Sequence, residues 1–240
     1  MTQSAQHGIR QDDRPAASPG RFDLLLTVMI AAYLLSAFTT GRWTVALRVL
    51  LFAVVALLAM RNSLVPRRIA GLIVAVVLAG SAVMLAVSFI NQAGRGIANI
   101  WAGLVLLFAV VVILYRVLSL TTVTMQSIYA AVSVYLIIGV AFASFFAAID
   151  YLNGGHFFAQ NQPGSTQAFQ YFSFSTLTTL GYGDFTAAGN FGRALATLEA
   201  MAGQIFLVTL VAFLVARFRS PGDQERSGLH TSWPGRDGRI

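Results

Sequence analysis

The chain has 240 residues, of which 57% are hydrophobic and 10% charged, and its mean hydropathy is +0.72. This composition lies far outside the range of soluble globular domains and indicates an integral membrane protein. The net charge of +7 comes from 16 arginines and no lysine, and the absence of cysteine excludes disulfides and thiolate metal sites. The arginines lie between apolar segments rather than on one face, which favours membrane orientation over nucleic-acid binding as their role.

Six apolar segments come close to the ~20 residues that a helix needs to cross a bilayer. We expect transmembrane helices at 22–39, 43–60, 69–91, 97–115, 127–149 and 193–216. No small-residue cleavage pattern follows the first segment, so we expect a retained span rather than a signal peptide. The predicted fold class is therefore an all-α membrane protein with six transmembrane helices.

These helices divide the chain into regions. Polar composition without apolar periodicity predicts disordered tails at both ends, and a mixed polar and apolar stretch predicts an interfacial linker. The expected regions are a tail at 1–20, a four-helix domain at 21–117, the linker at 118–126, a second module at 127–217 and a tail at 218–240.

The arginines are distributed unequally between the two sides of the membrane. With the amino terminus inside, twelve arginines lie on the inner side, and Arg42, Arg95 and Arg193 lie on the outer side. The positive-inside rule then predicts a multi-pass protein of the plasma (inner) membrane with both termini in the cytoplasm. The loop between the last two spans falls on the outer side.

The first four spans lack the charge pattern of a voltage sensor. Moving one charge through the membrane field yields ~2.3 kcal/mol per 100 mV, so a sensor needs several basic residues along one helix. The fourth expected span is uncharged and only Arg116 lies at its inner end, while Arg48 in the second span is a single base that can snorkel. We therefore predict weak or no voltage dependence.

A short helix that enters and leaves the membrane on one side is expected between the last two spans. The loop 150–166 has turn chemistry, and Ser165 or Thr166 could cap a helix that continues to Thr178. About a dozen residues are too few to cross a bilayer. A segment of this kind is tolerated at membrane depth where it lines a water-filled path. Its carboxyl end would then favour a cation.

The stretch Thr179-Leu180-Gly181-Tyr182-Gly183 follows this helix directly. Successive carbonyls of an extended chain point to opposite sides, so a row that faces one way needs left-handed φ/ψ angles at intervals, which glycine adopts without a Cβ clash. Four copies around an axis would stack rings of carbonyl oxygens, with the Thr179 hydroxyl at the inner end, and these oxygens can replace the hydration shell of a cation. A simple turn between two helices is the alternative. The position between two spans, after an apolar helix rich in threonine, favours the ion site.

This stretch resembles the selectivity filter of potassium channels. In this chain Leu180 stands where that family usually has Val. The order of elements over 127–217 also follows the pore module of that family: outer helix, pore helix, filter and inner helix. The resemblance implies a potassium-selective homotetramer that needs no cofactor, with K⁺ bound by the carbonyls of 179–183 and the Thr179 hydroxyl. It implies filter support from Tyr171, Phe172, Ser175, Thr178 and Asp184.

Two of these supporting positions depart from the family. The aromatic pair is usually two tryptophans, and here it is Tyr171 and Phe172, of which Phe172 has no N–H to offer Asp184. The acid often found four positions before the filter threonine is Ser175. The bracing behind the filter, and with it inactivation, is therefore expected to differ from the family pattern.

The last span carries candidates for gating. Gly203 stands where the family has a hinge glycine, and glycine in mid-helix costs ~1 kcal/mol relative to alanine. Close packing through a small residue is the alternative role. One helical face beyond it offers candidates for the cavity and inner gate, which could close by dewetting. These are Gln204, Leu207, Val208, Val211 and Val215.

Glu199 is the single acid deep within an expected span, since Asp23 is the second residue of the first span, and such a position marks a functional or paired residue. It could bond to a serine or threonine of the re-entrant helix, or it could raise the cation concentration near the cavity. The sequence leaves both roles open.

Two other functions were considered. A weakly selective cation channel or a non-conducting channel subunit would keep the same pore. An intramembrane enzyme would need a nucleophile with a base, or a metal site, at membrane depth. His7, His156 and His230 all lie outside the expected spans, so we expect no enzyme activity. No nucleic-acid or soluble partner is indicated.

Overall fold

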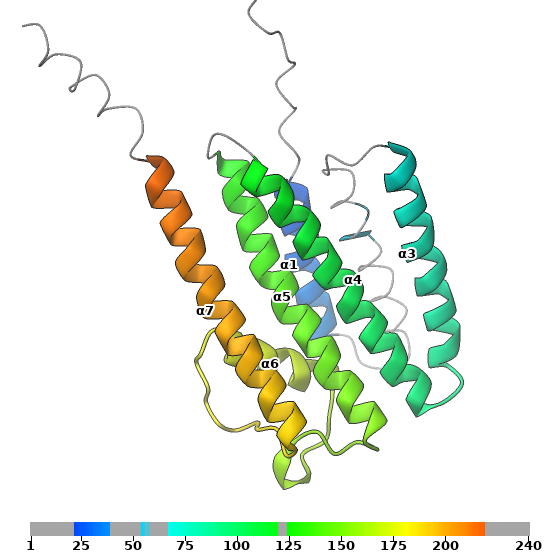
Figure 1. Ribbon diagram of the computed structural model, residues 1–240. Helices are drawn as coiled ribbons and strands as arrows, with labels where there is room; N and C mark the ends of the chain where they lie inside the picture. Colours follow the sequence, from blue (N-terminus) through cyan, green and yellow to red (C-terminus); the bar gives the residue numbers. More distant parts are fainter. Residues whose placement is uncertain (1–21, 39–53, 56, 58–66, 120–123, 219–240) are drawn as a thin grey trace, which may run out of the picture.

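The computed structural model describes residues 22–38, 54–55, 57, 67–119 and 124–218, and outside the loops on either side of the short helix at 166–177 these residues are mostly helical (Figure 1). Its named elements are α1 (Phe22–Phe38), α3 (Arg67–Ser88), α4 (Gln92–Ser119), α5 (Met125–Leu152), the 3₁₀ turn Ala159–Asn161, α6 (Thr166–Leu177) and α7 (Asn190–Phe218). Among the described residues, α3, α4, α5 and α7 are long and apolar enough to cross a membrane. The all-α class is therefore confirmed.

The described helices account for some of the six expected transmembrane spans. The four long helices correspond to the spans expected at 69–91, 97–115, 127–149 and 193–216. The first expected span is α1, whose 17 residues form a shorter apolar helix. The span expected at 43–60 lies outside the described residues apart from 54, 55 and 57, as do the tails except for Phe218. The count of six transmembrane helices stays a prediction.

Helices take up both ends of the expected linker. α4 continues through Ser119 and α5 begins at Met125, so little of the segment 118–126 remains between them. Thr124 and Ser127 form a capping box at the start of α5, with Thr124 N donating to Ser127 Oγ at 3.4 Å. This cap fixes where the outer helix starts.

Helix α5 is the centre of the bundle and contacts α1, α4, α6 and α7. Figure 1 shows α3, α4 and α5 side by side and antiparallel in turn, with α6 between α5 and α7 at the end of the bundle where α5 ends and α7 begins. Small residues allow this close packing. A Cβ on Gly139 of α5, for example, would lie 2.7 Å from the Phe174 ring of α6.

Helix α1 packs against the second module. Its Phe22 and Leu25 side chains are buried, and Phe22 N donates to Gln126 Oε1 of α5 at 2.9 Å. Further along, the Tyr33 ring meets the Phe174 ring edge-on at 5.2 Å between centroids. Helix α1 therefore touches α6 directly.

A cluster of phenylalanines fills the end of the bundle next to α6. We call it the aromatic cluster, and its members are Phe146, Phe157, Phe158, Phe169 and Phe172. Their ring centroids lie 5.0 to 5.8 Å apart, mostly edge-to-face, as aromatic pairs prefer. The cluster joins α5, the following loop and α6 into one core.

Backbone hydrogen bonds tie the loop before α6 to the loop after it. Ala159 N donates to Thr186 O at 2.8 Å, and Ala188 N donates to Phe157 O at 2.9 Å. Asp150, buried at the end of α5, accepts from Phe157 N at 3.1 Å. The two loops on either side of the segment 166–186 are therefore held together by hydrogen bonds.

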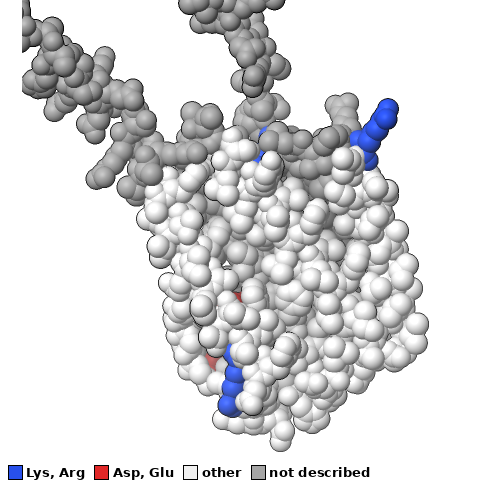
Figure 2. All heavy atoms as spheres, in the orientation of Figure 1, with Lys and Arg blue, Asp and Glu red and all other residues white. Residues whose placement is uncertain are grey.

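The arginine side chains of the described residues lie toward the ends of the bundle. In the view of Figure 2, arginine side chains lie toward its two ends, and the surface of the helices between them is mostly uncharged. This distribution suits helices that cross a membrane, because charge at the centre of a bilayer is costly.

We predict that Phe146→Ala destabilises the protein by about 3–5 kcal/mol, the usual cost of removing a buried phenylalanine side chain. Phe146 is fully buried and contacts two rings of the aromatic cluster. The measurement is denaturant unfolding in detergent. The matched control is Phe89→Ala, because Phe89 is 62% exposed at the end of α3. Equal stability of the two variants would contradict the prediction.

Candidate functional site

The short helix α6 is held at both ends as the sequence predicts. Ser165 is its N-cap, and the Ser165 side chain accepts a hydrogen bond from Ala168 N at 3.1 Å. The helix has 12 residues and ends at Leu177, with Thr178 as its C-cap. The expected short helix is therefore present, and the segment that follows begins at its carboxyl end.

The backbone after α6 alternates in handedness. Thr179, Gly181 and Gly183 have φ angles of +57°, +54° and +80°, whereas Leu180 and Tyr182 between them are not among the described residues with positive φ. The sequence predicts the left-handed state at the two glycines. It does not predict that state at Thr179, where a β-branched side chain makes it unfavourable.

The direction of two carbonyls follows from the hydrogen bonds of the same segment. Leu180 N and Gly181 N both donate to Ser175 O, at 2.9 and 3.2 Å, so these N–H groups point back at α6. No peptide bond here is cis, and in a trans peptide the carbonyl points opposite to the N–H. The carbonyls of Thr179 and Leu180 therefore point away from α6.

This segment is open on the side that its carbonyls face. Residues 179–184 are all exposed, including Leu180 at 57% and Tyr182 at 67%. A Cβ added to Gly181 or Gly183 would meet no atom within 4 Å. A single chain thus forms one wall of a site and leaves the other side free.

The residues expected to support the segment do so in different ways. Ser175 acts through its carbonyl, and Thr178 Oγ1 donates to Phe174 O at 2.7 Å. The ring of Tyr171 stacks on that of Tyr182, with a centroid distance of 6.3 Å and an interplanar angle of 3°. Phe172 is buried in the aromatic cluster instead.

Asp184 is braced at the outer end of the segment. Desolvation, followed by the hydrogen bond and charge of Asp184, raises the pKa of the Tyr171 phenol. Gln162 Nε2 also donates to Asp184 O at 3.1 Å. Tyr171 therefore supplies the contact to Asp184 that Phe172 lacks the N–H to make.

The inner helix α7 passes behind the start of the segment at close range. A Cβ on Gly203 would lie 2.4 Å from Leu177 O, and α7 is one continuous helix from Asn190 to Phe218. This short distance supports the packing role of Gly203, and the hinge role of Gly203 stays a prediction. The expected cavity residues on α7 are exposed in the single chain at Gln204, Leu207, Val208 and Val211, and the Val215 side chain lies outside the described residues.

Two contacts of this region were not predicted from the sequence. Tyr135 of α5 donates its hydroxyl to Leu177 O at 3.2 Å, and Gln204 Nε2 of α7 donates to Thr179 Oγ1 at 3.4 Å. A tyrosine in the middle of an apolar helix is the one sequence signal for the first, because a buried phenol usually needs a partner. Glu199 is fully buried and bonds to Ser173 of α6, one of the two roles that the sequence left open.

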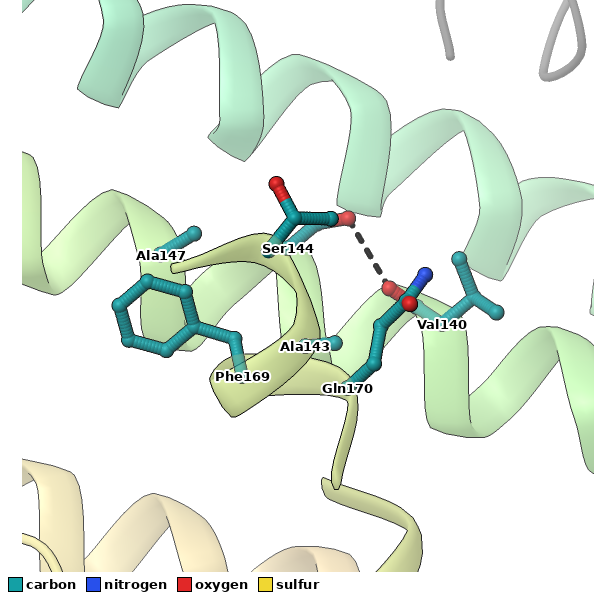
Figure 3. Close-up of a pocket in the computed structure, with 7 residues that line it drawn as sticks. Val140, Ala143, Ser144, Ala147, Phe169 and Gln170 are labelled. Carbon is teal, nitrogen blue, oxygen red and sulfur yellow. Dashed lines mark hydrogen bonds between the residues drawn. The ribbon is translucent and has the colours of Figure 1, made fainter. Parts of the chain in front are cut away.

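A small cavity lies on the other side of α6, where α6 meets α5. Its lining is mostly apolar, with Ser144 donating to Val140 O at 2.9 Å (Figure 3). The cavity measures about 10 Å³, which is room for one water-sized group and not for a ligand. The site of interest is therefore the exposed segment at 179–184.

A family model described as an ion channel matches residues 100–220, just over half of the chain. The chain belongs to this ion channel family. The match covers α5, α6, the exposed segment and α7, so these elements form an ion channel pore domain in a multi-pass membrane protein. It also bears out the expectation that the protein is not an enzyme.

One curated relative matches part of the chain. The inward rectifier potassium channel Kirbac3.1 of Paramagnetospirillum magnetotacticum is 39% identical over 75 residues, which are 31% of this chain and 25% of that protein. The match therefore spans about a quarter of the relative's length. No solved structure matches the chain significantly.

We predict that Gly203→Ala destabilises the channel, because the new Cβ would push on the Leu177 backbone next to the filter segment. Gly71→Ala is the control, since a Cβ there meets nothing within 4 Å and alanine gains about 1 kcal/mol over glycine in a helix. Thermal unfolding in detergent measures the difference. An altered open probability with unchanged stability would favour the hinge role instead.

Proposed function

We propose that this protein is a potassium-selective channel that conducts K⁺ passively through a pore made by four copies of the chain. The observation that carries the proposal is the alternation of left-handed backbone at Thr179, Gly181 and Gly183. Alternation of this kind turns successive carbonyls toward one side, where they can replace the water around a cation. The similarity to an inward rectifier potassium channel supports K⁺ as the ion.

The ion would bind to main-chain oxygens of residues 179–183 and to the Thr179 hydroxyl. Two of these carbonyls, those of Thr179 and Leu180, point away from α6, and their peptides are held by the Ser175 carbonyl behind them. Because the N–H groups are already bonded, the carbonyls need no reorganisation when an ion arrives. The carboxyl end of α6 adds roughly half a negative charge beside the inner end of the segment.

The geometry of one chain supports the proposed homotetramer. Each copy contributes one row of oxygens, and a dehydrated ion needs several such rows around it. The exposed side of the segment leaves room for the other copies. Residues 207, 208 and 211 of α7 would then line the inner cavity, with Gly203 and Gln204 at its top. By the positive-inside rule we place both termini in the cytoplasm and Asp184 on the outer side.

The test is ion flux in liposomes that hold purified protein, with K⁺ on one side and Na⁺ on the other. A reversal potential near that of K⁺ supports the proposal. A reversal potential near zero with clear flux would favour the weakly selective cation channel. No flux from a correctly assembled tetramer would favour the non-conducting subunit.

In the same assay, we predict that Gly181→Ala and Gly183→Ala each abolish or strongly reduce K⁺ flux. Space around both positions is open, so the effect comes from the backbone, where a left-handed non-glycine residue costs roughly 1–2 kcal/mol. Gly189→Ala is the matched control, because Gly189 is equally open but is not among the glycines with positive φ. Normal flux in both filter variants would refute the filter assignment.

We also predict a weak dependence of conductance on voltage. The described α4 has Arg95 near its start and Arg116 near its end, with no charged residue between them. Without several charges along one helix, the field can do little work on the protein. The measurement is the open probability of single channels in a planar bilayer over a range of voltages. A steep change with voltage that requires several gating charges per channel would contradict this prediction.

A further inference from the structure

Glu199 lies in an unusual place for a carboxyl group. Its side chain has no exposed surface, and it projects from α7 toward Ser173 of α6, which is also fully buried. Ser173 Oγ is within hydrogen-bonding distance of two oxygens, Glu199 Oε1 and the carbonyl oxygen of Gly139 on α5, the latter at 2.6 Å. Three helices of the pore domain therefore meet at one hydroxyl group.

The number of protons at this junction decides which group donates. A serine hydroxyl has one proton and can donate one hydrogen bond, and a backbone carbonyl can only accept. If Glu199 were ionised, Ser173 would have two acceptors for one proton, and one of the two short contacts would be a repulsive pair of oxygens. A protonated Glu199 removes the conflict, because it donates to Ser173 Oγ while Ser173 donates to Gly139 O.

The surroundings of Glu199 agree with an uncharged group. Its other oxygen, Oε2, has no hydrogen-bond partner among the described residues. The lack of a hydrogen-bond partner is strongly unfavourable for a buried carboxylate oxygen but far less so for the carbonyl oxygen of a neutral acid.

The titratable or charged groups nearest to Glu199 on α5 and α7 donate their hydrogen bonds to other acceptors. Tyr135 faces Glu199 from α5 and donates its hydroxyl to Leu177 O. Arg193 precedes Glu199 by six residues on α7, about 9 Å along the helix, and its Nε donates to Ala187 O at 3.0 Å. Helix α6 carries no charged residue.

We propose that Glu199 is an uncharged, proton-donating acid that positions the pore helix, through a hydrogen-bond chain from Glu199 to Ser173 to the Gly139 carbonyl. This hydrogen-bond chain holds α6 between α5 and α7 at Ser173. Ser173 lies two residues before Ser175, whose carbonyl holds the filter segment. Glu199 is then a positioning residue that carries no charge, and it does not attract cations to the cavity. This inference concerns the pore domain and holds whichever ion passes.

The protonation state can be observed directly, because Glu199 and Glu225 are the two glutamates of the chain. Purified Glu225→Gln protein, labelled with ¹³C at the glutamate carboxyl, gives one side-chain signal in solid-state NMR. At neutral pH we expect the chemical shift of a protonated carboxylic acid. The shift of a carboxylate would overturn the proposal. This readout does not depend on conduction, so its failure is distinct from failure of the proposed function.

Variants test the positioning role. Glu199→Gln keeps a donor for Ser173 at the same distance and should retain the melting temperature of the wild-type protein. Glu199→Met has similar size but no donor, and it should lower the melting temperature and the ratio of K⁺ to Na⁺ permeability. Ser173→Ala should cost less stability in the Glu199→Met background than in the wild-type protein, because the Glu199–Ser173 bond is then already absent and only the bond to Gly139 O remains to be lost. A Gln variant as impaired as the Met variant, or additive losses in the double variant, would overturn the proposal.

Discussion

The structure of the pore domain depends on a backbone segment whose carbonyls are forced to one side. The Ser175 carbonyl accepts from two successive N–H groups, and planar trans peptides convert that anchor into a direction for the carbonyls of Thr179 and Leu180. In the proposed channel, main-chain oxygens supply most of the ligands of the ion, and the Thr179 hydroxyl is the single side-chain group among them. A left-handed threonine costs energy, and the contacts of α6 must offset it.

Helix α6 is therefore the element that the rest of the fold positions. Ser165 caps its start, and the aromatic cluster encloses one of its sides. At its other end Leu177 O lies against Gly203 and accepts from Tyr135, so both the inner and the outer helix fix the point from which the filter segment departs. A helix too short to cross the membrane gains its stability from this packing rather than from its own length.

Local sequence signals predicted the features of this arrangement that depend on residues close together in the sequence. The cap at Ser165, the length of α6 and the glycines at 181 and 183 follow from propensity and steric rules. The left-handed Thr179 and the contacts of Tyr135 and Gln204 could not be predicted, because they arise where helices distant in sequence meet. Helix ends also shifted outward, as in α4, since polar residues such as Gln92 and Ser119 extend a helix beyond its apolar part.

The exposed surface of one chain is not a surface that lipid can cover. α7 exposes Val208 and Val211, which hydrocarbon would tolerate, but the same side of the domain presents Gln204 and the exposed backbone of residues 179–184. A polar backbone group left unsatisfied in hydrocarbon costs several kcal/mol. α3 differs, because Leu72, Val76 and Val83 expose only apolar groups and can face lipid directly. In the proposed channel this polar side faces water and ions, and further copies of the chain keep lipid away from it.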